Sequence, residues 1–362
     1  MTERELVVIG ASAGGLEALI HLIEALPKNL PAAVVVVIHT RADSTSYLPE
    51  ILARRSHLRV EFAQDKGDIE PGCIYVAPPD FHVLIADDQQ LCLSRGPKEN
   101  GFRPAIDPLF RSAARTKGDA VIGVVLSGGL DDGTYGLQTI KDAGGVTVVQ
   151  NPEEAIVPGM PQSAIRHVEP DYVLGAAEIG KLIVKLSGTP VAREAAMAKR
   201  TDPEPQDPGD VTEVLDMQKV FGPATGLTCP DCGGALWEIK EGQLFRYRCH
   251  VGHQYSSEGL DVEQHEAVEG ALWSAVRVLE EHAELRRRMA LRATHAGLSN
   301  VSEGFETSAS DSKRQAAQIR ALLFTRRTPE PTRAADHPRP DPPRTRRAVA
   351  RKTTAPRKRP RS

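Results

Sequence analysis

A short apolar run that ends in a glycine-rich turn constrains the fold of this chain more than any other feature. Residues 5–15 read ELVVIGASAGG, which predicts a buried strand over Leu6–Ile9, a turn, and a helix that begins near Gly14. Glycines permit left-handed backbone or the close approach of a ligand, and the first amides of the helix can face an anion or a developing oxyanion. Ser12 stands at the apex of the turn, the position that a nucleophilic hydroxyl requires.

Two other interpretations of this stretch stay open at this point. A dinucleotide-binding fingerprint needs the spacing G-x-G-x-x-G, and here Ser12 occupies the place of the middle glycine, where a pyrophosphate must come close. The stretch is also compatible with an ordinary strand-to-helix turn of an α/β domain. Other segments of the chain are needed to decide.

Further strand and helix units predict a doubly wound α/β domain over residues 1–188. The run Ala33–Ile38 is β-branched without alternation, which is typical of a strand buried on both faces of a parallel sheet. Asp119–Leu126 is another buried run, and it leads through SGGLDDGTYG into a helix, which repeats the opening pattern. Repeated units of this kind give a mainly parallel sheet with helices on both faces.

The segment between these units is predicted from shorter patterns. Four short apolar runs bounded by turns lie between residues 58 and 94, so we expect a β-rich insertion there. Asp107 and Pro108 open an apolar-periodic stretch that extends to Lys117. They predict a helix with Asp107 as its N-cap and Pro108 at its first position.

Beyond residue 188 the composition changes several times. Residues 189–222 are polar and proline-bearing, as linkers are, and residues 223–257 contain a cysteine and histidine cluster. Residues 258–324 show amphipathic helical spacing, which predicts a long helix over Leu260–Arg292 and a shorter one over Ser310–Phe324. Residues 325–362 carry 13 Lys and Arg against 3 Asp and Glu. We expect this basic tail to be disordered and suited to nucleic acid or an anionic membrane, with a plain solvated extension as the alternative.

The bulk composition excludes several classes of protein. The 362 residues are 40% hydrophobic, which is enough for a real core, and the formal charge of −3 combines an acidic folded part with the basic tail. No apolar run approaches the ~20 residues of a membrane span, and the N-terminus lacks a signal-peptide core. We therefore expect a cytoplasmic protein.

Three strand ends carry side chains suited to catalysis. Ser12 follows the first strand, His39 follows Ala33–Ile38, and the pair Asp131-Asp132 follows Leu126. The carboxyl ends of parallel strands meet at one edge, where a nucleophile, a base and an orienting carboxylate would form a Ser-His-Asp triad. Taken singly, the histidine is compatible with a structural role and Asp-Asp-Gly with a plain turn. The α/β-hydrolase fold has another order, because its nucleophile lies mid-chain and its histidine comes last.

Six ordered segments over about Leu6–Ile183 form a wider pattern: VVIGASAGGLEAL, VVVVIHT, IYVAPPDFHVLI, RPAIDPLFRSAA, VVLSGGLDDGTYGL, and GMPQSAI followed by DYVL. Together they resemble the catalytic domain of chemotaxis protein-glutamate methylesterases. The resemblance implies that Ser12 is the nucleophile, His39 the general base and Asp132 the orienting acid. It also implies hydrolysis of γ-glutamyl methyl esters on chemoreceptor signalling helices, deamidation of glutamine there, and no cofactor for catalysis.

Two departures from the family pattern stand out. Amides near Ala13 and Gly129 are candidate oxyanion donors, but the family usually has threonine and methionine at these two positions, which leaves the substrate preference open. The typical member also carries an N-terminal receiver domain, whereas here Leu6–Ile9 is already the first catalytic strand. We therefore expect a receiver-less form, and similar cysteine-rich segments with a trailing helix occur in such relatives.

A second candidate site lies in the cysteine-containing module. Cys229 and Cys232 form a C-x-x-C pair, and after sixteen intervening residues Cys249 and His253 form a C-x₃-H pair. These four residues suit a closed, structural, tetrahedral Zn²⁺ site, whereas His250, next to Cys249, would point away from the same ion. A thioredoxin-like redox pair is the alternative for Cys229 and Cys232, although the βαβ context is missing.

The sequence thus favours a methylesterase of chemoreceptor-like proteins. A catalytically weak signalling scaffold that uses the zinc module and helices for assembly is the alternative. The amphipathic helix predicts a homodimer or packing on a partner helix. The receptor, the pathway and the regulation stay open.

Overall fold

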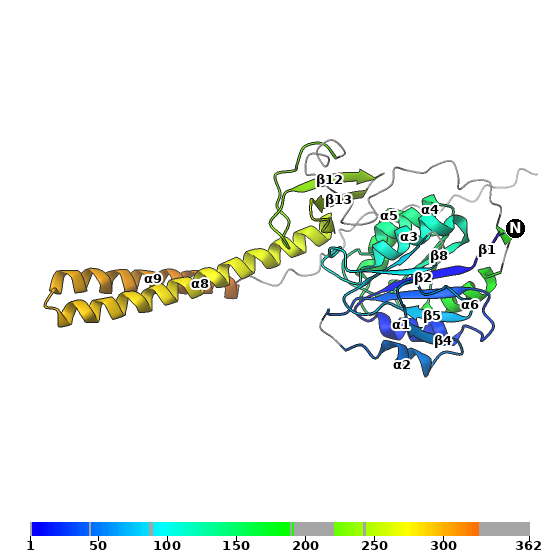
Figure 1. The fold of residues 1–362 in the computed structure, drawn as a ribbon, viewed down its shortest axis with the longest axis horizontal. Coiled ribbons are helices and arrows are strands. Elements are labelled where there is room, and N and C mark those ends of the chain that lie inside the picture. The colour runs from blue at the N-terminus through cyan, green and yellow to red at the C-terminus, as the bar shows by residue number, and fades with distance from the viewer. Residues whose placement is uncertain are drawn as a thin grey trace, which may run out of the picture. The chain divides into compact units, whose positions relative to one another are not determined.

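The computed structural model describes residues 2–42, 45–86, 90–188, 190–191, 221–241 and 244–325 (Figure 1). These residues belong to two compact units, one that ends at Gly270 and one that begins at Ala271. Most of the predicted linker and all of the predicted basic tail beyond Thr325 lie outside the described residues. None of the described helices is long and apolar enough to cross a membrane.

A seven-stranded sheet forms the centre of the first unit. Its strand order is β10-β9-β8-β2-β3-β5-β4, and every pairing is parallel. The strands are β2 (Leu6–Ala11), β3 (Ala33–Ile38), β4 (Arg59–Phe62), β5 (Cys73–Val76), β8 (Val121–Val125), β9 (Val146–Gln150) and β10 (Tyr172–Leu174). The predicted doubly wound parallel sheet is confirmed.

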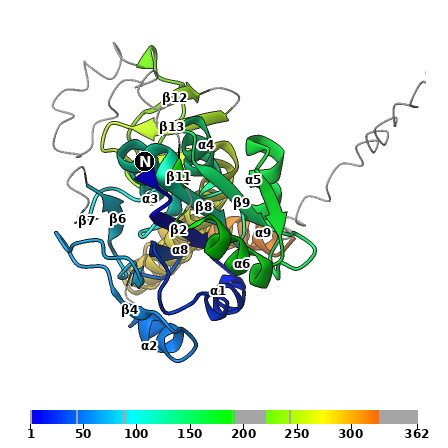
Figure 2. The ribbon, with the colours of Figure 1, turned by 90° about the vertical axis from the view of Figure 1, so that its right-hand side faces the viewer.

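Helices cover both faces of this sheet (Figures 1 and 2). One face packs on α1 (Gly15–Glu24), α2 (Leu48–Ala53) and α6 (Ala176–Leu186), and the other on α3 (Ile106–Lys117), α4 (Thr134–Asp142) and α5 (Gly159–Val168). The valines of β3 alternate between these two cores, with Val34 and Val36 in one and Val35 and Val37 in the other. This double burial explains why the strand shows no polar alternation.

The predicted β-rich insertion is wrong for two of its four strands. β4 and β5 extend the main parallel sheet at its edge, and only β6 (His82–Ile85) and β7 (Leu91–Ser94) form a separate antiparallel hairpin. Strands of four residues carry too little periodicity to reveal their partners. Strands β1 (Thr2–Glu3) and β11 (Pro190–Val191) form a short antiparallel pair of their own. A 3₁₀ turn at Gly118–Ala120 precedes β8.

The N-cap predicted for α3 is also wrong. The helix begins at Ile106 with Ala105 as its N-cap, so Asp107 is already the second helical residue. The Asp107 carboxylate accepts a hydrogen bond from the backbone N–H of Gly136 at 2.7 Å instead of capping its own helix. Asp107 therefore ties α3 to α4.

The cysteine-containing module belongs to the first unit and is a small antiparallel sheet. It consists of β12 (Leu236–Glu241), β13 (Leu244–Cys249) and β14 (Gln254–Ser256). Its own core contains Leu236, Tyr255 and Leu260 together with two of the cysteines. The long helix α8 (Ser257–His295) begins immediately after β14.

The second unit is a pair of helices. The part of α8 from Ala271 onward and α9 (Ser299–Thr325) are joined by a short turn that contains Gly297 at φ +74°. Small buried residues, among them Ala283, Ala290, Ala309 and Ala316, let the two helices come close. The α9 helix begins eleven residues earlier than the predicted Ser310.

Candidate active site and metal centre

The three predicted triad residues meet at the carboxyl edge of the sheet. Ser12 follows β2, His39 follows β3 and Asp132 follows β8, and β2 lies between the other two strands. After β2 the chain first adds strands on the side of β3, and after α3 it continues with β8 on the other side of β2. The strand order therefore reverses at β2, and this edge is the topological switch point where ligands bind in open α/β sheets. His39 Nδ1 lies 3.1 Å from Ser12 Oγ, and His39 Nε2 lies 2.7 Å from Asp132 Oδ2.

The orientation of the imidazole fixes the division of work between its nitrogens. Because the Asp132 carboxylate accepts hydrogen bonds, His39 Nε2 carries the proton that is donated to it. Nδ1 is then the unprotonated nitrogen and can accept the Ser12 hydroxyl proton. The ring of Phe102 stacks on the imidazole at 3.8 Å between ring centroids, nearly parallel, and holds its plane.

Asp132 is buried and surrounded by hydrogen-bond donors. The backbone N–H groups of Ile106 and Asp107, in the first turn of α3, donate to it at 2.7 and 3.3 Å, and Asn100 Nδ2 donates at 3.0 Å. Burial alone would raise the pKa of Asp132, but the hydrogen bond and charge of His39 and these further donors lower the pKa below its ordinary value. Asp132 is therefore ionised and able to stabilise an imidazolium.

Asn100 and Phe102 were not found by reasoning from the sequence. Both belong to the tight turn Glu99–Phe102, in which the two end residues exchange backbone hydrogen bonds. The turn has no periodicity and no metal-ligand or triad spacing. The only available signal was its position directly before the segment RPAIDPLFRSAA.

The two predicted oxyanion residues lie on the loops that meet at Ser12. Ala13 follows Ser12 and is exposed, and the carbonyl oxygen of Ala13 accepts a hydrogen bond from Ser127 Oγ at 2.8 Å. A Cβ on Gly128 would lie 2.9 Å from Ser12 Cβ, so only glycine fits there, whereas a Cβ on Gly129 beside it would make only an ordinary contact, 4.0 Å from Val157 Cγ1. The donor role of Ala13 and Gly129 stays a prediction.

The acidic neighbour of the triad gives a testable pH dependence. Burial and the charges of Glu258 and Asp132 raise the pKa of Asp131 from 3.8 to about 7. The hydrogen bond that the Ser256 hydroxyl donates to Asp131 lowers the pKa and offsets only part of this rise. The folded state therefore binds more protons than the unfolded state between about pH 4 and pH 7, and the free energy of unfolding falls as the pH rises through this window.

Asp131→Asn removes this titration. At pH 8 we expect the variant to unfold at a higher urea concentration than the unsubstituted chain, and at pH 5 we expect the difference between the two to be smaller. Equal differences at the two pH values would contradict this assignment.

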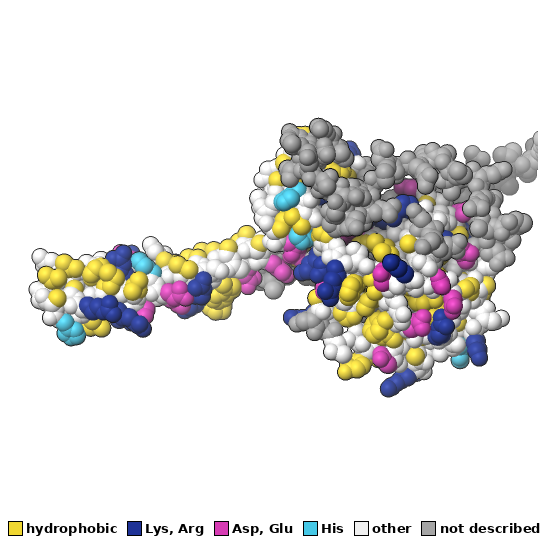
Figure 3. All heavy atoms as spheres, viewed as in Figure 1, with side chains coloured by type: hydrophobic (Ala, Val, Ile, Leu, Met, Phe, Trp, Pro, Cys, Tyr) yellow, Lys and Arg dark blue, Asp and Glu magenta, His cyan; other side chains and the backbone are white. Residues whose placement is uncertain are grey.

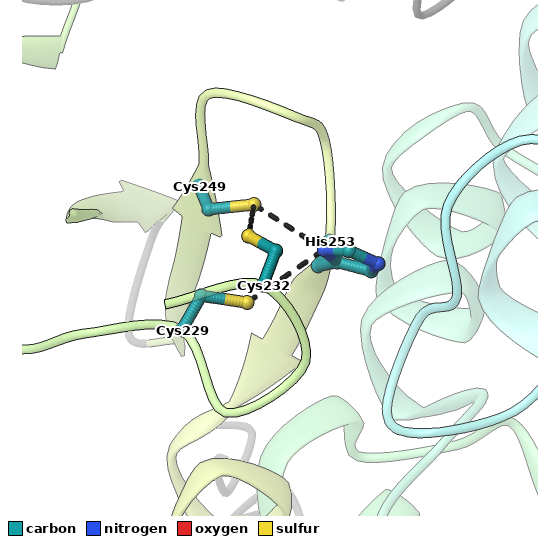
Figure 4. Close-up of side chains that lie close together, drawn as sticks. All are labelled: Cys229, Cys232, Cys249 and His253. Carbon is teal, nitrogen blue, oxygen red and sulfur yellow. Dashed lines mark hydrogen bonds between the residues drawn. The ribbon is translucent and has the colours of Figure 1, made fainter. Parts of the chain in front are cut away.

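The four predicted metal ligands converge in the module. The ligand atoms of Cys229, Cys232, Cys249 and His253 all lie within 4.8 Å of one another (Figure 4). Cys232 Sγ lies 3.7 Å from Cys249 Sγ, and His253 Nδ1 lies 3.7 and 3.5 Å from the Sγ atoms of Cys229 and Cys249. Tetrahedral bonds of about 2.3 Å to sulfur and 2.0 Å to nitrogen give edges of about 3.7 and 3.5 Å, so the set fits Zn²⁺.

His250 lies apart from this set, as the sequence predicted. It is not among the residues whose ligand atoms converge, and its ring lies 2.7 Å from the position that a Cβ on Gly234 would occupy. The backbone N–H of Gly233 donates to the carbonyl oxygen of Cys229, and the N–H of Cys229 donates to that of Gly234. These two bonds close the knuckle that presents the first two cysteines.

A doubly wound α/β domain with a hydrogen-bonded serine, histidine and aspartate at its carboxyl edge has the architecture of a serine esterase. The family model described as CheB methylesterase matches residues 7–183. A putative protein-glutamate methylesterase/protein-glutamine glutaminase of Leptospira interrogans is 40% identical over 182 residues, which cover 50% of this chain and 94% of that protein. The chain belongs to the CheB methylesterase family.

Other relatives match over the same part of the chain. The protein-glutamate methylesterase/protein-glutamine glutaminase 2 of Methanosarcina mazei and the corresponding protein of Thermotoga maritima are each 38% identical, over 51% and 50% of this chain. The match covers 52% and 54% of these two relatives, about half their length. The crystal structure of the Thermotoga maritima CheB methylesterase catalytic domain is 37% identical in sequence to the matched part of this chain. The match covers 51% of this chain and 100% of that domain, with a TM-score of 0.49.

Proposed function

We propose that this chain is a protein-glutamate methylesterase that hydrolyses γ-glutamyl methyl esters on chemoreceptor-like signalling helices and also deamidates glutamine there. The observation that carries the proposal is the continuous hydrogen-bonded relay from Ser12 through His39 to the buried, ionised Asp132. The names of the relatives from Leptospira and Thermotoga support this substrate class.

The geometry supports a two-step mechanism. His39 Nδ1 takes the Ser12 proton as Oγ attacks the ester carbonyl, and the protonated Nδ1 then gives it to the departing methoxide oxygen, so that methanol leaves. The product of this step is a γ-glutamyl ester on Ser12. Water, deprotonated by Nδ1, attacks the same carbonyl, and Ser12 Oγ recovers its proton as the glutamate carboxyl group is released. Throughout both steps, Asp132 accepts the hydrogen bond from the Nε2–H of His39 and stabilises the imidazolium.

Backbone amides at Ala13 and Gly129 are proposed to bind the oxyanion in both steps. Gly128 lies so close to Ser12 and Met160 that no side chain fits there, and Ser127 holds both loops through its hydrogen bonds to Ala13 and Val157. One such donor contributes roughly 10²–10³ in rate.

A serine-directed fluorophosphonate probe tests the proposal against the scaffold alternative. An activated Ser12 reacts with the probe, and the label should be lost in Ser12→Ala, while a scaffold with an idle serine should not react. Release of methanol from a methylated chemoreceptor helix fragment then tests the substrate class. The intact relay favours the esterase over the scaffold.

We also propose that the module binds one structural Zn²⁺ through Cys229, Cys232, Cys249 and His253. All four positions of a tetrahedron are taken, so the ion has no open position for substrate. Metal analysis of the unsubstituted chain should give about one zinc per chain, and Cys232→Ser should lose it. His250→Ala is the matched control and should keep its zinc. A metal-free chain with a folded module would contradict the site.

Two partner predictions remain proposals. Homodimerisation through the C-terminal helix is supported by exposed Val278 and Leu285, which lie one heptad apart on α8 within a helical pair that shows further apolar side chains (Figure 3). Contact of the basic tail with nucleic acid or an anionic membrane concerns residues outside the described part of the chain. The expected cytoplasmic location likewise stays a prediction.

A further inference from the structure

We propose that the cysteine and histidine module is a positioning element for the catalytic triad, and that its bound metal controls turnover through Asn100. The proposal rests on the proposed esterase and metal functions and adds a connection between them. It starts from strand β14 (Gln254–Ser256), which begins directly after the metal ligand His253 and reaches the turn Glu99–Phe102 beside the triad.

Strand β14 holds Asn100 from both sides. The backbone N–H of Asn100 donates to the carbonyl oxygen of Gln254 at 2.8 Å, and the backbone N–H of Ser256 donates to Asn100 Oδ1 at 2.8 Å. With its oxygen engaged in this way, the amide nitrogen of Asn100 points to the triad and donates to Asp132 Oδ1 at 3.0 Å. The residue is 8% exposed and has left-handed backbone at φ +51°, which asparagine tolerates better than most residues.

The same turn also reaches the general base. Phe102, two residues after Asn100, stacks on the His39 ring, so one four-residue turn contacts both the base and the orienting acid. Between them, Gly101 lies against Glu263 of α8: a Cβ there would come within 2.3 Å of the Glu263 carboxylate. The turn is thus enclosed between the triad and the elements that follow the metal ligands.

Further polar contacts fix the module against the catalytic domain. Glu99 forms a paired hydrogen bond with Arg111 at 2.8 and 2.9 Å, and Gln254 Nε2 donates to the same carboxylate at 3.4 Å. Arg246 of β13 lies over the ring of Tyr135 at 3.8 Å and donates to Gln254 Oε1. These contacts give β14 a defined register on the turn, as a positioning role requires.

The metal matters because a module this small is marginally stable without it. The module is held by three short strands and a core of a few side chains, and small domains of this size usually depend on their metal for folding. Loss of the ion would release β14, Asn100 would lose its two backbone partners, and Asp132 would lose one of its donors. The expected cost is that of removing a supporting hydrogen bond, about 10- to 100-fold in kcat.

The experiment measures kcat and KM for methanol release with the full chain. Asn100→Ala should lower kcat by about 10- to 100-fold with little change in KM, because Asn100 acts on Asp132 and not on the substrate. Removal of zinc from the unsubstituted chain with a chelator should lower kcat to a similar level, and zinc should restore it. Lys240→Ala, exposed on β12, is the matched control and should keep both constants.

The decisive measurement combines the two changes. Because both act through one turn, zinc removal should lower kcat of Asn100→Ala by much less than it lowers kcat of the unsubstituted chain. Full turnover after zinc removal, or full turnover of Asn100→Ala, would overturn the inference, as would independent, multiplying losses. Failure of the esterase proposal gives a different result, because the unsubstituted chain would then release no methanol whether or not zinc is bound.

Discussion

Replacement of Ser12 by alanine should abolish ester hydrolysis and leave the fold unchanged. Without Oγ, the His39 Nδ1 atom has no hydroxyl to deprotonate at 3.1 Å, and the γ-glutamyl ester on the enzyme cannot form. Removal of the nucleophile of such a triad lowers kcat by roughly 10⁶-fold. The backbone N–H of Ser12, which donates to the carbonyl oxygen of Ser127 at 2.9 Å, is kept, so the turn should stay in place.

The measurement is methanol release together with a thermal melt. Ser310→Ala, an exposed serine on α9, serves as the matched control and should keep full turnover. A Ser12→Ala chain that turns over at the rate of the unsubstituted protein would remove the assignment of the nucleophile. A chain that loses both turnover and its melting transition would instead assign a structural role to Ser12.

The second large effect is expected for Asp132→Asn. The four groups that hydrogen-bond to this carboxylate are all donors: His39 and Ile106 reach one oxygen, and Asp107 and Asn100 reach the other. An asparagine must turn its NH₂ group toward one of these pairs, which loses hydrogen bonds and favours the wrong imidazole tautomer. A loss of about 10⁴-fold in kcat is expected.

The pH profile of kcat and labelling by the fluorophosphonate probe check this assignment. Labelling should slow together with turnover, because Ser12 is then no longer activated. Asp142→Asn, an exposed residue at the end of the neighbouring helix α4, is the control and should behave like the unsubstituted chain. Unchanged labelling of Asp132→Asn would show that the carboxylate does not support the base.

The positions of the three triad residues could be predicted because these residues come after the carboxyl ends of buried strands. Ser12 and His39 each come directly after a buried run, Asp132 lies in the glycine-rich turn after another, and the carboxyl ends of parallel strands necessarily share one edge. The convergence of the four candidate metal ligands could be predicted because tetrahedral sites impose a short spacing on Cys229 and Cys232, and on Cys249 and His253.

The rest could not be predicted because it depends on contacts without a local signal. Asn100 and Ser256 are 156 residues apart, and neither lies in a periodic stretch. The edge strands β4 and β5 are too short to identify their partners. Asp107 stands before a proline at the start of an apolar-periodic stretch, which favours a cap, and no sequence pattern indicates its contact with Gly136 on α4. The start of α9 was missed because its interior uses small residues such as Ala309 and Ser312 instead of an apolar stripe.

The stacking of Phe102 on His39 restricts what the imidazole can do during the reaction. With one ring face covered at 3.8 Å and Nε2 held by Asp132 at 2.7 Å, the side chain has no freedom to rotate and exchange its nitrogens. A single atom, Nδ1, must therefore serve as proton carrier in both halves of the cycle. Nitrogen-15 labelling of histidine should accordingly report Nδ1 as the pyridine-type nitrogen in the resting protein and again after a full turnover.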